Sequence, residues 1–209
     1  MITHALLRRL RRDRRGATVI EFAIVAPVML ALLMGIFDLL YQVYAQALLN
    51  GALQKAGRDS SIQGGAQNTA TIDGTVIGMM TAIMKNPTKA CPVAATGAFT
   101  WCSTRKSYAQ FANIKPEDFT DSNGNGKRDA GECFTDINGN KTWDADPGIA
   151  SQGGANDVTV YSMTVSYPRL FPVYGLFGWS PNQSISATTV LKNQPYATQS
   201  AQAVASICT

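Results

Sequence analysis

The acidic stretch between residues 117 and 148 contains side chains whose types and spacing could bind a metal ion. Residues 121–132 fit the calcium-loop spacing D-x-[DN]-x-[DN]-G-x5-E without a mismatch. Alternate side chains in such a loop converge on one hard cation, and a glycine at the sixth position permits the sharp turn. The ninth residue often acts through a water molecule, and the closing glutamate supplies both oxygens. The predicted calcium ligands are Asp121, Asn123, Asn125, the carbonyl of Lys127, Asp129 and Glu132.

A second, incomplete copy of this pattern follows fifteen residues later. Lys141 stands in place of the glycine and Pro147 in place of the closing glutamate. Residues 117–146 carry eight acidic and three basic side chains, a local charge of −5 that would repel itself without a cation. The loops resemble the EF-hand-like loops of dockerin-type and related extracellular calcium modules, and affinities of about 0.1–1 mM are expected for such modules. The alternative is a pair of Asn-Gly surface turns. The predicted ligands of the second loop are Asp136, Asn138, Asn140 and Asp144.

A single carboxylate, Glu21, lies inside a long apolar run near the start of the chain. Residues 17–40 contain only two charged side chains, Glu21 and Asp38. As a helix these residues would extend about 36 Å, enough to cross a hydrocarbon core of about 30 Å. A carboxylate in a bilayer costs about 2.5–3.5 kcal/mol on insertion scales, so it needs a partner unless it simply reaches out to the interface. A cleaved secretory signal is a weaker explanation, because the run is long and no convincing A-x-A site follows it.

The positive charge of the chain is concentrated before this run. Of 18 basic and 14 acidic residues, six arginines and Asp13 lie in residues 1–16, so the remainder carries 12 basic and 13 acidic residues. The positive-inside rule places residues 1–16 in the cytoplasm and the main domain on the other side. A nucleic-acid-binding surface is not expected on a main domain with this charge. We also expect no enzyme, because the only histidine, His4, is in the leader and no nucleophile–base set is visible.

The pattern along the chain predicts an α+β protein. We expect a membrane-spanning helix over 17–40, its amphipathic continuation over 41–63, and an α+β domain over 64–209 with the calcium-loop-like insert at 117–148. Pro27 could kink the helix, and Gly57 with Gly64-Gly65 should end it. The amphipathic part either packs on its own domain or contacts another subunit. A second helix is predicted over 69–84, and antiparallel strands over 158–167 and 184–192. Residues 170–179 either pack under the sheet or form an exposed apolar patch, and 194–207 should be a polar tail.

Four cysteines lie beyond the apolar run, on the side expected to be exported. An even number there favours two disulfides over a zinc site, which would lack both a CxxC pair and a histidine ligand. Three connectivities are possible, and we favour Cys91–Cys102 together with Cys133–Cys208.

The start of the chain resembles a known signature. Gly16-Ala17-Thr18-Val19-Ile20-Glu21-Phe22 is similar to a type IV prepilin cleavage site, and residues 16–38 resemble the start of TadE-like proteins of the tight-adherence (Flp) pilus system. A weaker resemblance to that family returns at 158–168 and 190–195. The calcium-like insert and the cysteines are not part of the short family pattern.

This resemblance implies cleavage between Gly16 and Ala17 by a prepilin peptidase. Cleavage would remove the basic leader and free an amine, usually N-methylated in this family, one helical turn from Glu21. It implies a minor-pilin or pseudopilin component of a Tad-type pilus assembly or secretion machine that works by helix packing among pilin-like subunits. The expected location is the bacterial inner membrane, with one pass, a cytoplasmic N-terminus and a periplasmic main domain. An anchored calcium-dependent adhesive module and a polymerising pilin are the alternatives.

Overall fold

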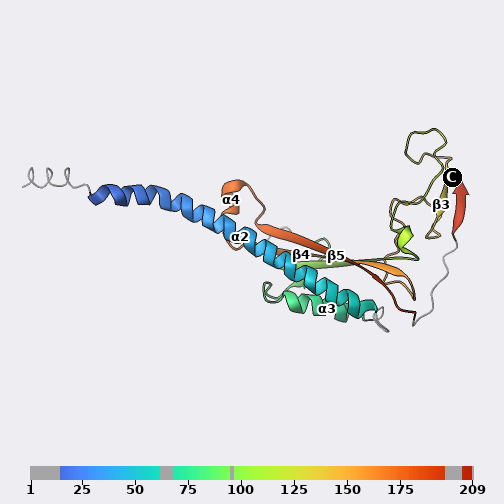
Figure 1. The fold of residues 1–209 in the computed structure, drawn as a ribbon, viewed down its shortest axis with the longest axis horizontal. Helices are drawn as coiled ribbons and strands as arrows, with labels where there is room; N and C mark the ends of the chain where they lie inside the picture. Colours follow the sequence, from blue (N-terminus) through green and yellow to red (C-terminus); the bar gives the residue numbers. More distant parts are fainter. Residues whose placement is uncertain (1–14, 62–67, 95–96, 196–203, 209) are drawn as a thin grey trace, which may run out of the picture.

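The computed structural model describes residues 15–61, 68–94, 97–195 and 204–208 of the chain, and the side chains from Thr18 onward. Its architecture is α+β, as predicted: a long N-terminal helix, a second helix and a mixed sheet (Figure 1). The helices are α2 (Arg15–Ser61), α3 (Thr69–Met80) and α4 (Tyr174–Phe177), with a 3-10 turn at Phe111–Asn113. The strands are β1 (Thr88–Lys89), β2 (Thr100–Tyr108), β3 (Cys133–Asp136), β4 (Val158–Pro168), β5 (Asn182–Lys192) and β6 (Ala205–Cys208).

Helix α2 is continuous through Pro27 and has two parts with different surroundings. Its N-terminal part projects away from the sheet, whereas its C-terminal part lies along α3 and the sheet (Figure 1). Among residues 18–44 only Asp38 is buried. From residue 45 onward every third or fourth side chain enters the core, because apolar residues recur at helical spacing there. These buried residues are Ala45, Leu49, Ala52, Leu53 and Ala56.

The core lies between the two helices and one face of a four-stranded sheet of order β1-β2-β4-β5. Strands β2, β4 and β5 are antiparallel, and β1 adds in parallel to β2. The predicted strand at 158–167 is confirmed with its inward face, since Tyr161, Met163, Val165 and Tyr167 are all buried. Strand β5 faces the core with Ile185, Ala187 and Leu191, also as the alternation predicts.

Helix α3 is held on the sheet by a buried carboxylate. Asp73 forms an ion pair with Arg105, 2.6 Å between Oδ1 and Nη2, and accepts hydrogen bonds from Tyr161 at 2.6 Å and Ser103 at 2.7 Å. Burial alone would raise the pKa of Asp73, but the bonds from Arg105, Tyr161 and Ser103 outweigh it and hold the pKa below its usual value. The helix ends at Met80, earlier than the predicted residue 84, although Ile83 and Met84 still pack into the core.

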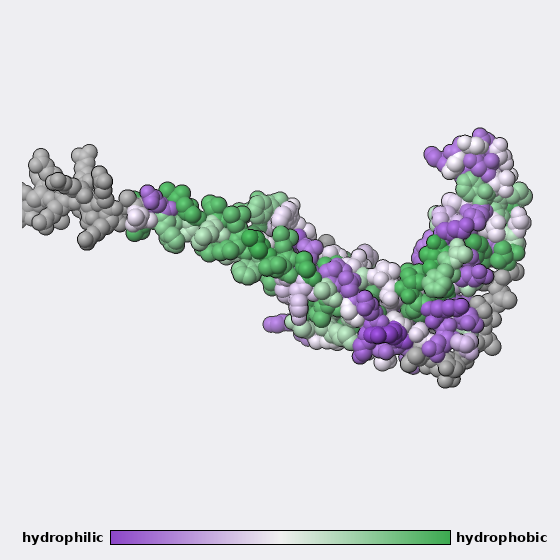
Figure 2. All heavy atoms as spheres, viewed as in Figure 1, coloured by the Kyte–Doolittle hydropathy of each residue, from purple (hydrophilic) through white to green (hydrophobic). Residues whose placement is uncertain are grey.

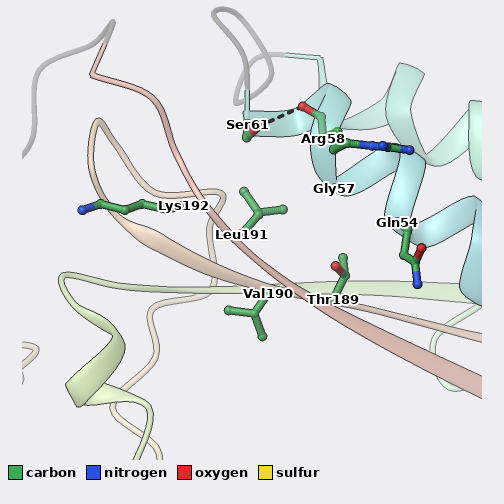
Figure 3. Close-up of a pocket in the computed structure, with 8 residues that line it drawn as sticks. All are labelled: Gln54, Gly57, Arg58, Ser61, Thr189, Val190, Leu191 and Lys192. Atoms are coloured by element: carbon green, nitrogen blue, oxygen red, sulfur yellow. Dashed lines mark hydrogen bonds between the residues drawn. The ribbon is translucent and has the colours of Figure 1, made fainter.

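Gly57 does not end α2, contrary to the sequence-based expectation. The helix continues to Ser61, and Gly57 is the point where it passes close to β5 (Figure 3). A Cβ atom at this position would lie 3.3 Å from the side chain of Thr189. The glycine therefore permits close helix–sheet packing. Figure 3 shows Gln54, Gly57 and Arg58 of α2 on one side and Thr189 and Leu191 of β5 on the other.

The far end of the molecule is a second, smaller sheet, in which β3 pairs antiparallel with β6. Residues 194–207 are thus not simply a polar tail, because their last part forms β6. The disulfide Cys133–Cys208 joins the two strands, and Cys91–Cys102 joins the segment after β1 to β2. Both disulfides have the pairing favoured from the sequence.

Candidate functional site

The projecting part of α2 is the first candidate site. By length and composition α2 is the one helix, among the residues described, that could cross a membrane, and no residue of its most apolar stretch is buried. Figure 2 shows hydrophobic side chains on the surface of this part of the helix. Gly16 and Ala17 lie in its first turn, and the side chain of Glu21 is exposed. From Thr18 to Asp38 the helix rises about 30 Å, the thickness of a hydrocarbon core. Glu21 would lie near one end of this span and Asp38 at the other.

Asp38 marks the point where the helix meets the rest of the protein. Its side chain is 4% exposed and forms an ion pair with Arg169, which follows β4. The backbone N–H of Leu170 donates to Asp38 Oδ1 at 3.3 Å, and Arg169 Nε donates to the carbonyl of Ser180 at 2.9 Å. A buried carboxylate needs such partners, because an unpaired charge out of water is costly. Asp38 is therefore an internal anchor for the loop after β4.

The acidic loops are the second candidate site, and the first loop folds around Asp121. The Asp121 carboxylate accepts backbone N–H groups from Gly124, Asn125 and Gly126 at 2.7–3.1 Å. The amides of Asn123 and Asn125 both reach Asp129, at 2.8 and 2.6 Å. The N–H of Gly126 is the leading reason that the pKa of Asp121 is lowered, so this carboxyl is held ionised.

Glu132 closes the first loop as the spacing predicts. One of its oxygens accepts the N–H of Ser122 at 2.8 Å and the other accepts the N–H of Asp129 at 2.9 Å. Ser122 and Asp129 are the second and ninth residues of the loop, so the carboxylate bridges its two ends. The predicted residues Asp121, Asn123, Asn125, Asp129 and Glu132 are thus gathered in one loop.

The second loop repeats this geometry without a closing glutamate of its own. Asp136 accepts the N–H groups of Gly139 at 2.7 Å and Lys141 at 2.9 Å. Asn138 and Asn140 donate to Asp144, at 2.8 and 2.6 Å. Lys141 adopts a positive φ of 65°, the conformation that Gly126 adopts in the first loop at 75°. The substitution of lysine for glycine therefore leaves the turn intact, at the cost of backbone strain.

Glu117, which precedes both loops, takes the place of the missing closing glutamate. Its Oε1 accepts the N–H of Ile137 at 2.8 Å and its Oε2 accepts the N–H of Asp144 at 3.0 Å. Ile137 and Asp144 are again the second and ninth residues of the loop. Glu117 is only 1% exposed, and its own N–H donates to the carbonyl of Asp144 at 3.0 Å. Sequence reasoning missed this residue.

A signal for Glu117 was present in the sequence. Asp121 and Asp136 are fifteen residues apart, and Glu117 precedes Glu132 by the same interval. Extending the repeat backwards from Glu132 therefore reaches Glu117. In the forward direction the repeat gives no such residue, because Pro147 stands fifteen residues after Glu132.

The carboxylate of Asp146, directly after the second loop, connects the loops to strand β2 of the main sheet. Asp146 pairs with Lys106 of β2 and accepts the hydroxyl of Tyr108 at 2.6 Å. Burial and the nearby Asp146 raise the pKa of Tyr108 well above its usual value, so the hydroxyl stays a donor. Trp143 adds an indole N–H bond to the carbonyl of Glu117 at 2.9 Å. Asp146 therefore holds the second loop against β2, and Trp143 holds it against Glu117.

The side chains of the loops that could bind a metal ion include both carboxylates and amides. Within the parts of the chain that the structure describes, no group of three or more histidine, cysteine or acidic side chains is arranged to hold a metal ion. Each loop brings together an aspartate at its first and ninth positions, two asparagines and a glutamate that bridges the ends. Carboxylate and amide oxygens of this kind, with backbone carbonyls, are the ligands that Ca²⁺ takes in proteins.

Comparison with known proteins bears on one of these two sites. Residues 16–58 match the family model described as TadE-like protein. No curated protein and no solved structure matches the chain. The match begins at the predicted cleavage glycine and ends within the last turn of α2, so the acidic loops and the sheet lie outside it. Over residues 16–58 this chain therefore resembles TadE-like proteins.

Proposed function

We propose that this chain is a membrane-anchored, minor-pilin-like component of a Tad-type pilus assembly or secretion machine. The observation that carries the proposal is the projecting part of α2, which is apolar, is not buried by the other described residues and is included in the TadE-like match. An apolar helix that the rest of the described chain leaves exposed is expected to be covered by lipid or by other helices. Residues 17–40 anchor the precursor in the inner membrane and later pack against the helices of pilin-like subunits. The protein acts by packing and performs no catalysis.

Processing is the first step of this proposal. A prepilin peptidase cuts between Gly16 and Ala17, which removes six arginines and frees an amine at the start of α2. The amine lies four residues from Glu21, within reach of a charge-assisted pair in the same subunit or a neighbouring one. The main domain then remains on the periplasmic side, where the two disulfides are stable.

The Gly16→Ala variant tests the processing step. It should accumulate as full-length precursor in cells that contain the peptidase, whereas Gly35→Ala should be processed normally. Gly35 is a matched control, since it lies in the same helix and a Cβ atom there would contact nothing within 4 Å. A mature-sized band from Gly16→Ala on an immunoblot would rule out this cleavage site.

A second function, calcium binding by the two acidic loops, is favoured by the shared geometry of the loops. In each, a glutamate bridges the second and ninth residues and two asparagines face the ninth. Two sites are proposed: one closed by Glu132 and one closed by Glu117. At a Kd of about 1 mM, 10 mM calcium would stabilise the fold by about 1.4 kcal/mol for each occupied site. The bound loops would supply the adhesive or partner-binding end of the anchored protein.

Isothermal titration of the full chain in detergent with calcium tests this second function. The unaltered chain should bind two ions, and Glu132→Gln and Glu117→Gln should each lose one of them. Asp118→Asn is the matched control, because Asp118 is a neighbouring acid that pairs with Lys115 outside the loops. Absence of binding heat and of any thermal shift at millimolar calcium would rule out both sites. An unchanged adhesion phenotype in a strain with Asp121 and Glu132 replaced would rule out the adhesive role alone.

A further inference from the structure

The loop between β4 and β5 presents an apolar surface that the proposed function does not use. Residues 170–191 contain no charged side chain. Between residues 170 and 179 the side chain of Val173 is buried, whereas four large apolar side chains are exposed. They are Leu170 at 51% exposed, Leu176 at 74%, Phe177 at 54% and Trp179 at 44%. We call these four residues the α4 foot.

The α4 foot lies at one particular height along α2. The N–H of Leu170 bonds to Asp38, and the guanidinium of Arg169, paired with Asp38, lies 5.3 Å from the ring centre of Trp179. Figure 1 shows α4 beside α2 at the end of the sheet nearest the projecting part. Asp38 is the residue at which a span beginning near Thr18 reaches about 30 Å. The foot is therefore level with the place where the hydrocarbon core would end.

We propose that the α4 foot rests in the membrane, at the boundary between lipid headgroups and acyl chains on the side that holds the main domain. Leu39, Leu40 and Val43 of α2 are exposed at the same height, so the foot continues the apolar surface of the membrane-spanning helix. Tryptophan is enriched at this boundary because its ring is apolar and its N–H polar. The foot and α2 then form two neighbouring contacts with the bilayer, which fixes the tilt of the domain.

The absence of charge around the α4 foot favours lipid, rather than another protein, as the partner that covers it. A soluble protein interface would combine an apolar centre with a polar or charged rim, whereas the stretch from 170 to 191 offers no charge. Arg169, the cation that directly precedes this stretch in the sequence, pairs with Asp38 and donates to the Ser180 carbonyl. This inference rests on the membrane anchoring in the proposed function, and the experiment below separates the two.

Quenching by brominated lipids tests the proposal on the full chain in proteoliposomes. The chain has three tryptophans, Trp101, Trp143 and Trp179. The variant Trp101→Phe/Trp143→Phe retains only Trp179, and its emission should fall by roughly half when the upper acyl methylenes carry bromine. The matched variant Trp101→Phe/Trp179→Phe retains only Trp143, which lies within the second acidic loop, and should be unaffected. A third variant replaces all three tryptophans by phenylalanine and adds Phe37→Trp. Its emission reports whether the apolar part of α2 lies in the bilayer.

The three reporters give outcomes that separate the foot from the anchor. Quenching of Trp179 together with the Phe37→Trp reporter, and not of Trp143, supports the foot. Quenching of the span reporter alone overturns the foot and leaves the anchor, whether Trp179 is then open to aqueous acrylamide or covered by protein. Absence of quenching at both positions overturns the foot and the anchor together. Should the double variants fold poorly, Trp179→Phe in the otherwise unaltered chain must abolish most of the quenching, or the proposal fails.

Discussion

The two parts of α2 are built largely from the same kinds of residue and have opposite surroundings. Leucine, valine, isoleucine and alanine dominate residues 18–44, where only Asp38 is buried. Between residues 45 and 56, by contrast, Leu49 and Leu53 are at most 1% exposed. The difference follows from the polar residues. In the second part Asn50, Gln54 and Arg58 recur at steps of four and give the helix an outer face.

This comparison shows that apolar content alone does not locate the core. The first part has no polar face that could be exposed to water. It therefore fits an environment that is apolar on all sides, such as the interior of a bilayer. The second part has one apolar stripe, which fits a single packed surface. Substitutions in the packed part of α2 should therefore affect stability most, and substitutions in the projecting part least.

The largest effect is expected from shortening a leucine in the packed part. Leu49→Ala should lower the free energy of unfolding by about 3 kcal/mol, because it removes buried apolar atoms and leaves a cavity. Leu39→Ala, at a position 51% exposed, should change it by less than about 0.5 kcal/mol. Denaturant unfolding of both variants in the same detergent measures the difference. Similar losses from the two substitutions would contradict the division of α2.

A smaller effect is expected at Asp38, where the two parts meet. Asp38→Ala should cost about 2 kcal/mol, since it leaves the Arg169 guanidinium buried without its carboxylate. The double variant Asp38→Ala/Arg169→Met should recover much of this loss, because no unpaired charge remains. Unfolding of the single and double variants tests the coupling. If the double variant is no more stable than Asp38→Ala, the ion pair is not the reason that Asp38 is buried.

Acid should weaken the packing of α3 on the sheet, because the buried carboxylate of Asp73 holds that helix in place. The folded pKa of Asp73 lies below its unfolded value, so its contribution to stability is complete above the unfolded pKa of about 3.9 and is lost as pH falls through the folded pKa. The midpoint of thermal unfolding should therefore change little because of Asp73 above about pH 5, and should fall between about pH 4 and 2. Asp73→Asn should be less stable at pH 6 and should show a shallower fall. A parallel pH profile in the two proteins would exclude Asp73 as the titrating group.

The smallest effect on stability is expected from Glu21 in the projecting part. Its side chain is exposed and no shared core depends on it, so Glu21→Ala should leave unfolding unchanged. The same substitution should spare cleavage after Gly16 and abolish or strongly reduce pili, because the new amine loses its partner. Glu21→Gln, which keeps the shape and removes the charge, should behave in the same way. Normal pili in both variants would remove the proposed role of Glu21.

Elements with a strong period were predictable from the sequence. The long helix, the second helix and the strand at 158–167 follow from periods of 3.6 and 2. The boundaries of these elements were less predictable. Gly57, for example, is a typical end signal for a helix, yet here it allows α2 to approach Thr189. Strand β6 was missed because residues 205–208 are short and become a strand only through pairing with β3 and the Cys133–Cys208 disulfide. Such long-range pairing leaves no local pattern.

The candidate sites show the same division between local and long-range information. The first acidic loop was predictable because all its residues lie within one contiguous motif. Glu117 was missed because its partners Ile137 and Asp144 are twenty and twenty-seven residues away. The Asp38–Arg169 pair spans a separation of 131 residues, and it lies where the segment after β4 meets α2. Only the folded chain brings these groups together.

Mass spectrometry of the N-terminus of the protein isolated from its own cells tests the central claim most directly. A chain that begins at Ala17, with or without an N-methyl group, is the predicted result, since α2 is proposed to be released from the basic leader after Gly16. A chain that retains Met1 or any part of residues 1–16 would contradict the assignment of α2 as a processed assembly helix.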